Sequence, residues 1–117
     1  MKIESYSFGN MKIDGKTYSN DLMIVDNEIR PDWYRDKGHS LASDDLKWII
    51  EKAPEVLIVG SGKSGLMKVP QRTRDYLEQK GINYTIERTD QAVEVYNERL
   101  DSESRKEKVA GAFHLTC

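Results

Sequence analysis

The most constraining feature of this sequence is a short apolar run, VLIV at residues 56–59, between two segments with strong helix signals. A β-branched run of this length is typical of a strand that is buried on both faces. The segment before it carries an apolar stripe at helical spacing and stops at Pro54. The segment after it, residues 70–81, starts with Pro70 and stops at Gly81. The pattern predicts an α/β fold.

Other segments extend this alternation. Asp14-Gly15 lies between two short runs and suits the positive φ angles of a hairpin turn, so the chain is expected to begin with β structure. The remaining predictions are three strands and two helices, with Ser43 as N-cap of the first helix: strands at 22–25, 82–87 and 109–115, helices at 43–53 and 89–100. Residues 26–42 are expected to form a loop, and residues 101–108 a solvated loop or frayed helix end. Together they predict an α/β sandwich around a mixed sheet.

Composition and charge exclude several classes of protein. The 117 residues predict a single domain, 1–117, and the net charge of -2 gives no general attraction to nucleic acid or anionic membranes. The longest apolar runs span four or five residues, well short of the roughly 20 that cross a membrane. The first ten residues contain no apolar core of a signal peptide, and Cys117 has no second cysteine to pair with. We therefore expect a cytoplasmic protein.

The segment GSGKSG at residues 60–65 follows the buried strand and resembles two phosphate-binding motifs. Gly62-Lys63-Ser64 matches the end of the P-loop, but Leu57 occupies the position of its first glycine. Gly60, Gly62 and Gly65 match the G-x-G-x-x-G motif of dinucleotide-binding folds, with Glu87 at the usual distance for the ribose. However, helix signals begin only near Pro70, which would leave the glycines away from a helix dipole. Neither nucleotide motif is complete.

Two interpretations of the glycine segment stay open. The glycines can form a mobile turn with Lys63 and Ser64 in solvent, or the loop can line a cleft for a small anion or a partner. In the second interpretation the loop PDWYRDKGHS at residues 31–40 faces it, contributing aromatic, cationic and imidazole side chains. His114 and Cys117 lack enough neighbouring ligands for a metal site, so no metal and no cofactor are expected. In an apolar strand, His114 is expected to be a hydrogen-bonded core histidine.

Four segments together resemble a known family of small domains: WYRDKGH, GSGKSGLMKVP, GINYTIERTDQAVEVYN and GAFHLTC. The family includes the adipogenesis-associated domain protein of vertebrates and the mitochondrial complex I assembly factor three, and its biochemical function is unknown. The resemblance covers almost the whole chain, which looks like a stand-alone prokaryotic member. It implies a three-layer α/β sandwich, with a central mixed sheet of about five strands, helices on both sides and an N-terminal β-hairpin layer. It also favours an interaction module over an enzyme.

Two hypotheses about function follow. The first is a non-catalytic binding or assembly module, with a cleft at the carboxyl ends of the sheet strands for a protein partner or a small anion. The second is an enzyme acting on a small acidic or phosphorylated metabolite, with His39 or His114 as acid/base and the glycine loop as anion cradle. The residues expected to line the cleft are Trp33, Arg35, His39, Gly60, Ser61, Gly62, Lys63 and Lys68.

Overall fold

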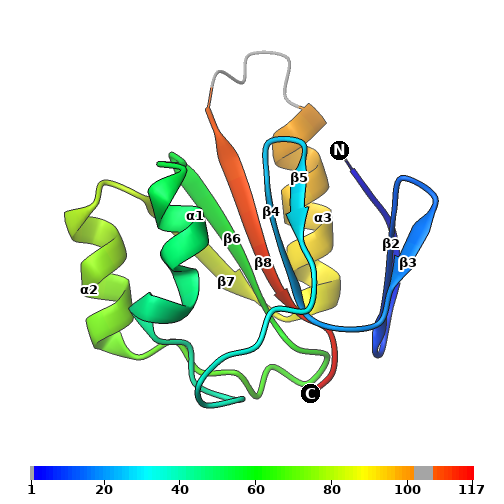
Figure 1. The fold of residues 1–117 in the computed structure, drawn as a ribbon, viewed down its shortest axis with the longest axis horizontal. Coiled ribbons are helices and arrows are strands. Elements are labelled where there is room, and N and C mark those ends of the chain that lie inside the picture. Colours follow the sequence, from blue (N-terminus) through cyan, green and yellow to red (C-terminus); the bar gives the residue numbers. More distant parts are fainter. Residues whose placement is uncertain (1, 102–106) are drawn as a thin grey trace.

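The computed structural model describes residues 2–101 and 107–117, which form two sheets and several helices (Figure 1). The strands are β1 (Ile3–Ser7), β2 (Asn10–Ile13), β3 (Lys16–Tyr18), β4 (Leu22–Val25), β5 (Glu28–Arg30), β6 (Val56–Ser61), β7 (Asn83–Glu87) and β8 (Val109–His114). The helices are a 3-10 turn, η1 (Ser43–Leu46), followed by α1 (Lys47–Glu51), α2 (Gln71–Gln79) and α3 (Thr89–Asp101). No described helix has the length and apolar character needed to cross a membrane.

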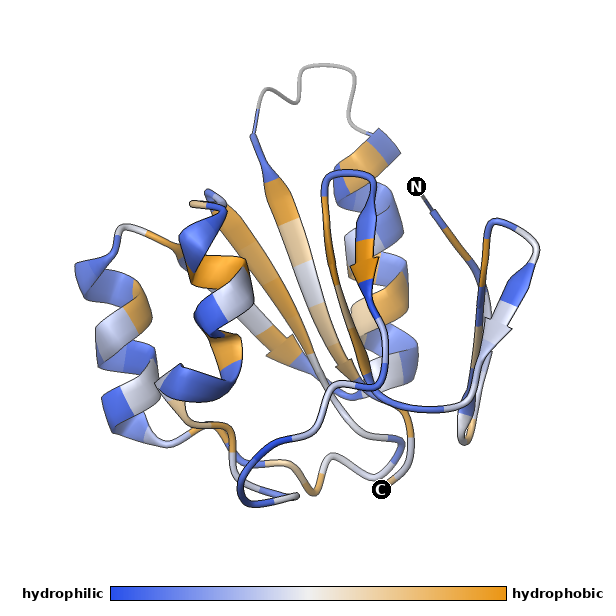
Figure 2. Ribbon diagram, viewed as in Figure 1, coloured by the Kyte–Doolittle hydropathy of each residue, from blue (hydrophilic) through white to orange (hydrophobic). Residues whose placement is uncertain are grey.

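The five-stranded mixed sheet is the middle layer of a sandwich. Its strand order is β5-β4-β8-β6-β7, with β8 parallel to β6 and antiparallel to β4. One face packs against α1 and α2 through a core that includes Leu57, Val59 and Leu77. The other face packs against α3 and the antiparallel sheet β1-β2-β3 through a core that includes Ile58 and Tyr96. Figure 2 shows the hydrophobic residues concentrated on the central strands. The expected three-layer α/β sandwich is confirmed.

The central position of β8 depends on its small residues. All six of its positions are buried, and it contributes Ala110, Gly111 and Ala112 between two neighbouring strands. A Cβ atom on Gly111 would lie 2.5 Å from the Phe113 ring and 3.2 Å from the Tyr96 ring. The closing segment of the chain therefore fits into the middle of the sheet only because it leaves room for the aromatic rings of α3 and β8.

Two predicted elements differ from the structure. The helix expected at residues 43–53 is a 3-10 turn followed by five α-helical residues, and Ala53 is exposed with a φ of 50°. Ser43 is not the N-cap; instead the Asp45 carboxylate accepts a hydrogen bond from the Ala42 N–H. The loop expected at 26–42 contains β5, which forms a hairpin with β4. The predicted solvated loop at 101–108 lies largely outside the described residues.

Candidate functional site

Three polar side chains from distant parts of the sequence meet at the carboxyl ends of β6 and β8. Asp21 Oδ2 lies 2.7 Å from His114 Nδ1 and 2.8 Å from Arg35 Nη2. Asp21 Oδ1 accepts a hydrogen bond of 2.7 Å from the Leu115 N–H. The side chains of Arg35 and His114 are 4% and 7% exposed. We call Asp21, Arg35 and His114 the polar corner.

The electrostatics of the polar corner favour an ionised Asp21. Burial by itself raises the pKa of this carboxyl group, because the charged form loses water. Hydrogen bonds from His114, the Leu115 N–H and Arg35 act in the opposite direction and together bring the pKa of Asp21 below its ordinary value. Asp21 is therefore the anion that holds the corner together.

The hydrogen-bond geometry places a hydrogen on Nδ1 of His114. This atom lies 2.7 Å from Asp21 Oδ2 and 3.1 Å from Arg35 Nη2, and because an ionised carboxylate can only accept, Nδ1 donates to Asp21. The other ring nitrogen, Nε2, is buried and has no hydrogen-bond partner among the described residues, and the same is true of Arg35 Nη1. The His39 ring packs against the His114 ring edge-on, with centroids 5.7 Å apart. The expectation of a hydrogen-bonded histidine at 114 describes Nδ1 but not Nε2.

The glycine loop lies directly beside this corner, because β6 and β8 pair in register from Val56 and Val109 to Ser61 and His114. A Cβ atom on Gly62 would lie 2.9 Å from His114 Cδ2 and 2.2 Å from the Cys117 carbonyl carbon. Gly62 also has a φ of 105°, which L side chains rarely adopt. Both its conformation and its surroundings therefore require glycine.

The backbone N–H groups of this loop bind oxygens of the chain itself. The Lys63 N–H donates to the Thr116 carbonyl at 2.6 Å. The N–H groups of Ser64 and Leu66 both donate to the Cys117 oxygen, at 3.3 and 3.0 Å. We call residues 62–66 the amide nest. It holds main-chain oxygens of the segment that follows β8.

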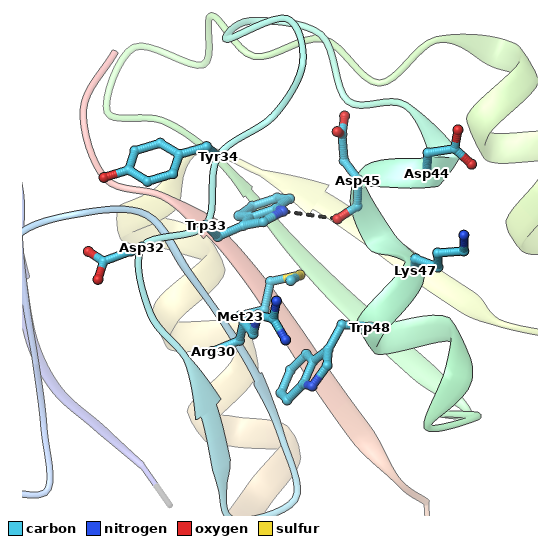
Figure 3. Close-up of a pocket in the computed structure, with 9 residues that line it drawn as sticks. All are labelled: Met23, Arg30, Asp32, Trp33, Tyr34, Asp44, Asp45, Lys47 and Trp48. Atoms are coloured by element: carbon cyan, nitrogen blue, oxygen red, sulfur yellow. Dashed lines mark hydrogen bonds between the residues drawn. The ribbon is translucent and has the colours of Figure 1, made fainter.

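On the other side of Trp33 lies an open pocket of about 370 Å³ (Figure 3). The Trp33 indole is buried and its Nε1 donates to the Asp45 carbonyl at 2.9 Å. Met23 from β4 and Trp48 from α1 provide further apolar lining. The other lining residues are mostly charged: Arg30, Asp32, Tyr34, Asp44, Asp45 and Lys47. We call this the aromatic pocket.

The structure brings some of the predicted site residues together and separates others. Arg35, His39 and Gly62 surround His114. Trp33 borders both regions, since the Arg35 guanidinium lies 4.8 Å from its ring centre while the indole lines the aromatic pocket.

Lys63 and Lys68 are both exposed. The Lys63 ammonium lies 5.6 Å from the centre of the Tyr6 ring. The main chain of Lys68 bonds across to the other loop, with its N–H on the His39 carbonyl at 2.8 Å. The two loops expected to face each other across a cleft are thus joined by hydrogen bonds at this point.

Gly60 and Ser61 are buried at the end of β6. A Cβ atom on Gly60 would lie 2.9 Å from both Phe113 and Thr89, and Ser61 Oγ donates to the Glu87 carbonyl at 3.0 Å. Helix α2 begins only at Gln71, so the glycines do not open a helix. Neither nucleotide-binding motif has its usual structural setting.

Three important residues were missed by sequence reasoning. Asp21 precedes a predicted strand, and nothing local marks it as the partner of His114, 93 positions away. Thr89 reads as a helix cap, but its hydroxyl accepts from the Gly62 N–H at 2.8 Å and donates to the His114 carbonyl at 2.6 Å. Trp48 has an ordinary place on a helix, and only the tertiary structure puts it opposite Trp33. Among the described residues, no group of three or more His, Cys, Asp or Glu side chains is placed to hold a metal.

The described residues form a small α/β sandwich domain in which the glycine segment 60–65 does not have the setting of a nucleotide-binding loop. The sequence profile of the family described as "Protein of unknown function (DUF498/DUF598)" matches residues 3–114. The chain belongs to this family, which confirms the resemblance to a group of small uncharacterised α/β domains.

Solved structures agree with this assignment. A conserved hypothetical protein from Pyrococcus horikoshii is 25% identical with a TM-score of 0.86, and the match covers 100% of both chains. A protein of Bartonella henselae, described as an outer membrane protein, is 23% identical over 98% of this chain and 94% of its own, with a TM-score of 0.81. A Bordetella pertussis protein described as a Mth938-like domain is 17% identical over 97% of this chain and 85% of its own, with a TM-score of 0.67. The last two show a shared fold.

Proposed function

We propose that this protein is a non-catalytic binding module that holds an extended segment of a partner protein in the aromatic pocket. The observation that carries the proposal is the pocket itself, an open hollow of about 370 Å³ between the indoles of Trp33 and Trp48. Aromatic side chains that line a concave surface are typical anchor points for a partner side chain. We place this activity in the cytoplasm, because Cys117 has no second cysteine with which to form an internal disulfide.

The strand next to the pocket supports an extended partner. β5 is the terminal strand of the five-stranded sheet, so it pairs with β4 alone in that sheet. Its outer edge carries main-chain groups that can pair with an added strand. Arg30 is the last residue of β5 and also lines the pocket. A segment lying along this edge would therefore lead one of its side chains toward Trp33 and Trp48.

Two cations at the pocket support a partner segment that contains an acidic residue. Within the described part of the chain, Arg30 and Lys47 have no ion-pair partner. Asp32 accepts from the Asn20 amide, and Asp45 accepts from backbone N–H groups; both carboxylates keep their charge, but their oxygens already have hydrogen-bond donors. Arg30 and Lys47 can therefore each pair with a carboxylate that a partner brings. A partner with an acidic residue beside an aromatic or large apolar residue matches this arrangement.

A random peptide library displayed on phage tests the proposal without a known partner. Selected peptides should contain an aromatic or large apolar residue next to Asp or Glu, and their affinity should fall at least about tenfold on Trp48→Ala. Arg30→Glu should also weaken the same peptides. Phe8→Ala, which removes an exposed aromatic residue from the turn after β1, is the matched control and should leave binding unchanged. Peptides that bind Trp48→Ala as well as the wild type would contradict the proposal.

One observation favours a second function, an enzyme acting on a small acidic or phosphorylated metabolite. Asp21 orients His114, and the ring lies beside Gly62, which is the arrangement an acid/base histidine next to an anion cradle needs. Incubation with a panel of phosphate monoesters and carboxylic acids, followed by NMR, tests this function. Conversion by the wild type that is absent in His114→Gln, at an unchanged melting temperature, would support it. No conversion of any compound by the folded wild type would count against it.

A further inference from the structure

We propose that two copies of this protein pair through β7, with the two strands antiparallel and a two-fold axis at Thr85. β7 lies at the opposite end of the five-stranded sheet from β5, so this surface is separate from the aromatic pocket. The proposal goes beyond the partner-binding function and stands or falls separately from it.

β7 offers an open edge to another strand. In the part of the chain that the structure describes, it pairs with β6 alone and is the last strand in the order of its sheet. The Asn83 N–H donates to the Glu55 carbonyl, on the β6 side. Because main-chain groups alternate in direction along a strand, the N–H and C=O groups of Tyr84 and Ile86 point away from β6. These are the groups that an added strand would bind.

β7 lacks the features that usually keep sheet edges apart. Proteins protect exposed edges with charged residues, proline or a bulge. The segment NYTI at residues 83–86 contains no charged residue and no proline, and the pairing of β7 with β6 runs through without a shift. The other terminal strands differ, since β3 and β5 carry charged residues and β1 has an irregular register with β2. β7 is therefore the edge best suited to pairing with another strand.

The sequence of β7 complements itself in one register. Thr85 of one copy would face Thr85 of the other. On either side of this central pair, Tyr84 would face Ile86, and at the strand ends Asn83 would face Glu87. This register pairs all five residues of the strand. It also makes hydrogen-bonded pairs of Tyr84 and Ile86, whose main-chain groups point outward, and leaves the two Thr85 residues as the closer, non-hydrogen-bonded pair.

The side-chain contacts in this register favour association. An aromatic residue would lie against a β-branched one, and threonine against threonine, which are both stabilising cross-strand pairs. The Asn83 amide can donate to the Glu87 carboxylate. Tyr84 and Ile86 pack against the core on the α1 and α2 face but remain partly exposed, so a second copy would cover apolar surface that the single chain leaves open.

The same pairing would leave the partner-binding region free. It would join two five-stranded sheets at their β7 edges, with a β5 edge at each far end. Arg30 of β5 lines the aromatic pocket, so each copy would keep its pocket open at a distance from the axis. The chain's most suitable occupant for the β7 edge is therefore a second copy of itself.

Gel filtration with light scattering, over a range of protein concentrations, tests the proposal on the full chain. The wild type should approach twice the chain mass of 13.5 kDa. Thr85→Lys and Thr85→Glu should each be monomeric, because each places two like charges opposite one another at the axis. An equimolar mixture of the two variants should recover the dimer, since opposite charges then face each other. Thr17→Lys, which changes a threonine in the terminal strand β3, is the matched control and should dimerise like the wild type.

A cysteine variant tests the same axis if the charged variants fail to fold. Thr85→Cys combined with Cys117→Ser should form a disulfide-linked dimer on mild oxidation. The reason is that a non-hydrogen-bonded pair brings its Cα atoms to about 4.5 Å, within the range of a disulfide. Thr17→Cys in the same background should stay mostly monomeric.

Three results would overturn the proposal. The first is a wild type that stays monomeric at every concentration. The second is a dimer that persists in folded Thr85→Lys and Thr85→Glu, because the axis would then lie elsewhere. The third is a Thr85→Cys variant that cross-links no better than Thr17→Cys.

Discussion

Charged groups on the two sides of Trp33 lie in opposite environments, one buried and paired, the other open and unpaired. On one side, Arg35 packs over the indole and joins Asp21 and His114 in a buried network whose hydrogen bonds are almost all made within the chain. On the other side, the indole faces an open pocket where Arg30 and Lys47 have no ion-pair partner among the described residues. The closed side uses its charges to hold the fold, whereas the open side leaves its charges available to another molecule.

This difference separates stability from binding. The polar corner connects the residue just before β4, the long loop before α1 and the last strand of the chain. Changes there should affect the free energy of unfolding. The aromatic pocket is formed by side chains at the surface of elements that are already fixed by other contacts, so changes there should mainly affect partner binding.

The largest effect should come from Asp21→Ala. Removing this carboxylate leaves the buried Arg35 guanidinium without its counter-ion, and breaking a buried ion pair on one side costs about 3–5 kcal/mol. Urea denaturation should show this loss. Asp101→Ala, which breaks the exposed pair with Lys2, is the control and should cost less than about 1 kcal/mol. Equal costs for the two variants would mean that the corner does not stabilise the fold.

The contribution of Asp21 should also depend on pH. Its folded-state pKa lies below the ordinary value of 3.8, so the unfolded chain binds the proton first as the pH falls. The stabilisation is complete above the unfolded pKa and is lost as the pH falls through the folded pKa. The difference in unfolding free energy between wild type and Asp21→Asn should therefore be constant near neutrality and shrink below pH 3.8. A difference that stays constant down to low pH would contradict this assignment.

Gly62→Ala should have the next largest effect, a loss of about 2–3 kcal/mol. The new Cβ would meet the Cys117 main chain at 2.2 Å, and the backbone φ of 105° is itself strained for alanine. Gly15→Ala separates the two causes, because Gly15 has a φ of 79° but no neighbour within 4 Å. It should cost about 1 kcal/mol. If the two variants lose the same stability, packing of the final segment on the loop contributes nothing.

Trp48→Ala should have the smallest effect on stability. The side chain is partly buried, so the loss should be about 1 kcal/mol rather than the 3–5 kcal/mol typical of a fully buried aromatic residue. The affinity for the selected peptides should fall at least about tenfold, which is a larger effect than the one on stability. A denaturation midpoint and a peptide affinity, measured on the same preparation, test this contrast. A stability loss as large as that of Asp21→Ala would place Trp48 in the core rather than in a binding surface.

Much of the fold could be predicted because short-range patterns carry it. The run at 56–59 is a buried strand, the Asp14-Gly15 turn joins two strands, and Thr89 begins the third helix. β5 was missed because three residues with one inward apolar side chain give no periodic signal. The first helix was predicted too long because its apolar stripe includes Ala53, which the chain uses in a left-handed turn before β6.

The candidate site was predictable only in part. The rule that ligands bind beyond the carboxyl ends of parallel strands correctly drew attention to the glycine loop. It could not show that the loop's N–H groups are taken by Thr116 and Cys117, because these contacts join residues more than fifty positions apart. The rule also could not show that Trp33 lines a pocket whereas Lys63 and Lys68 are exposed.

Short-range patterns in the amino-acid sequence determined most of the elements and the α/β sandwich class, because β-branched runs, helix stripes and turn residues act over a few positions; the three-layer arrangement was implied by the family resemblance. Only the tertiary structure decided that β8 enters between β4 and β6, since strand order depends on long-range pairing and on room for the Phe113 and Tyr96 rings. That choice carries His114 to Asp21 and Arg35 and brings Cys117 onto Gly62. The polar corner and the occupied amide nest are therefore consequences of where the last strand is placed.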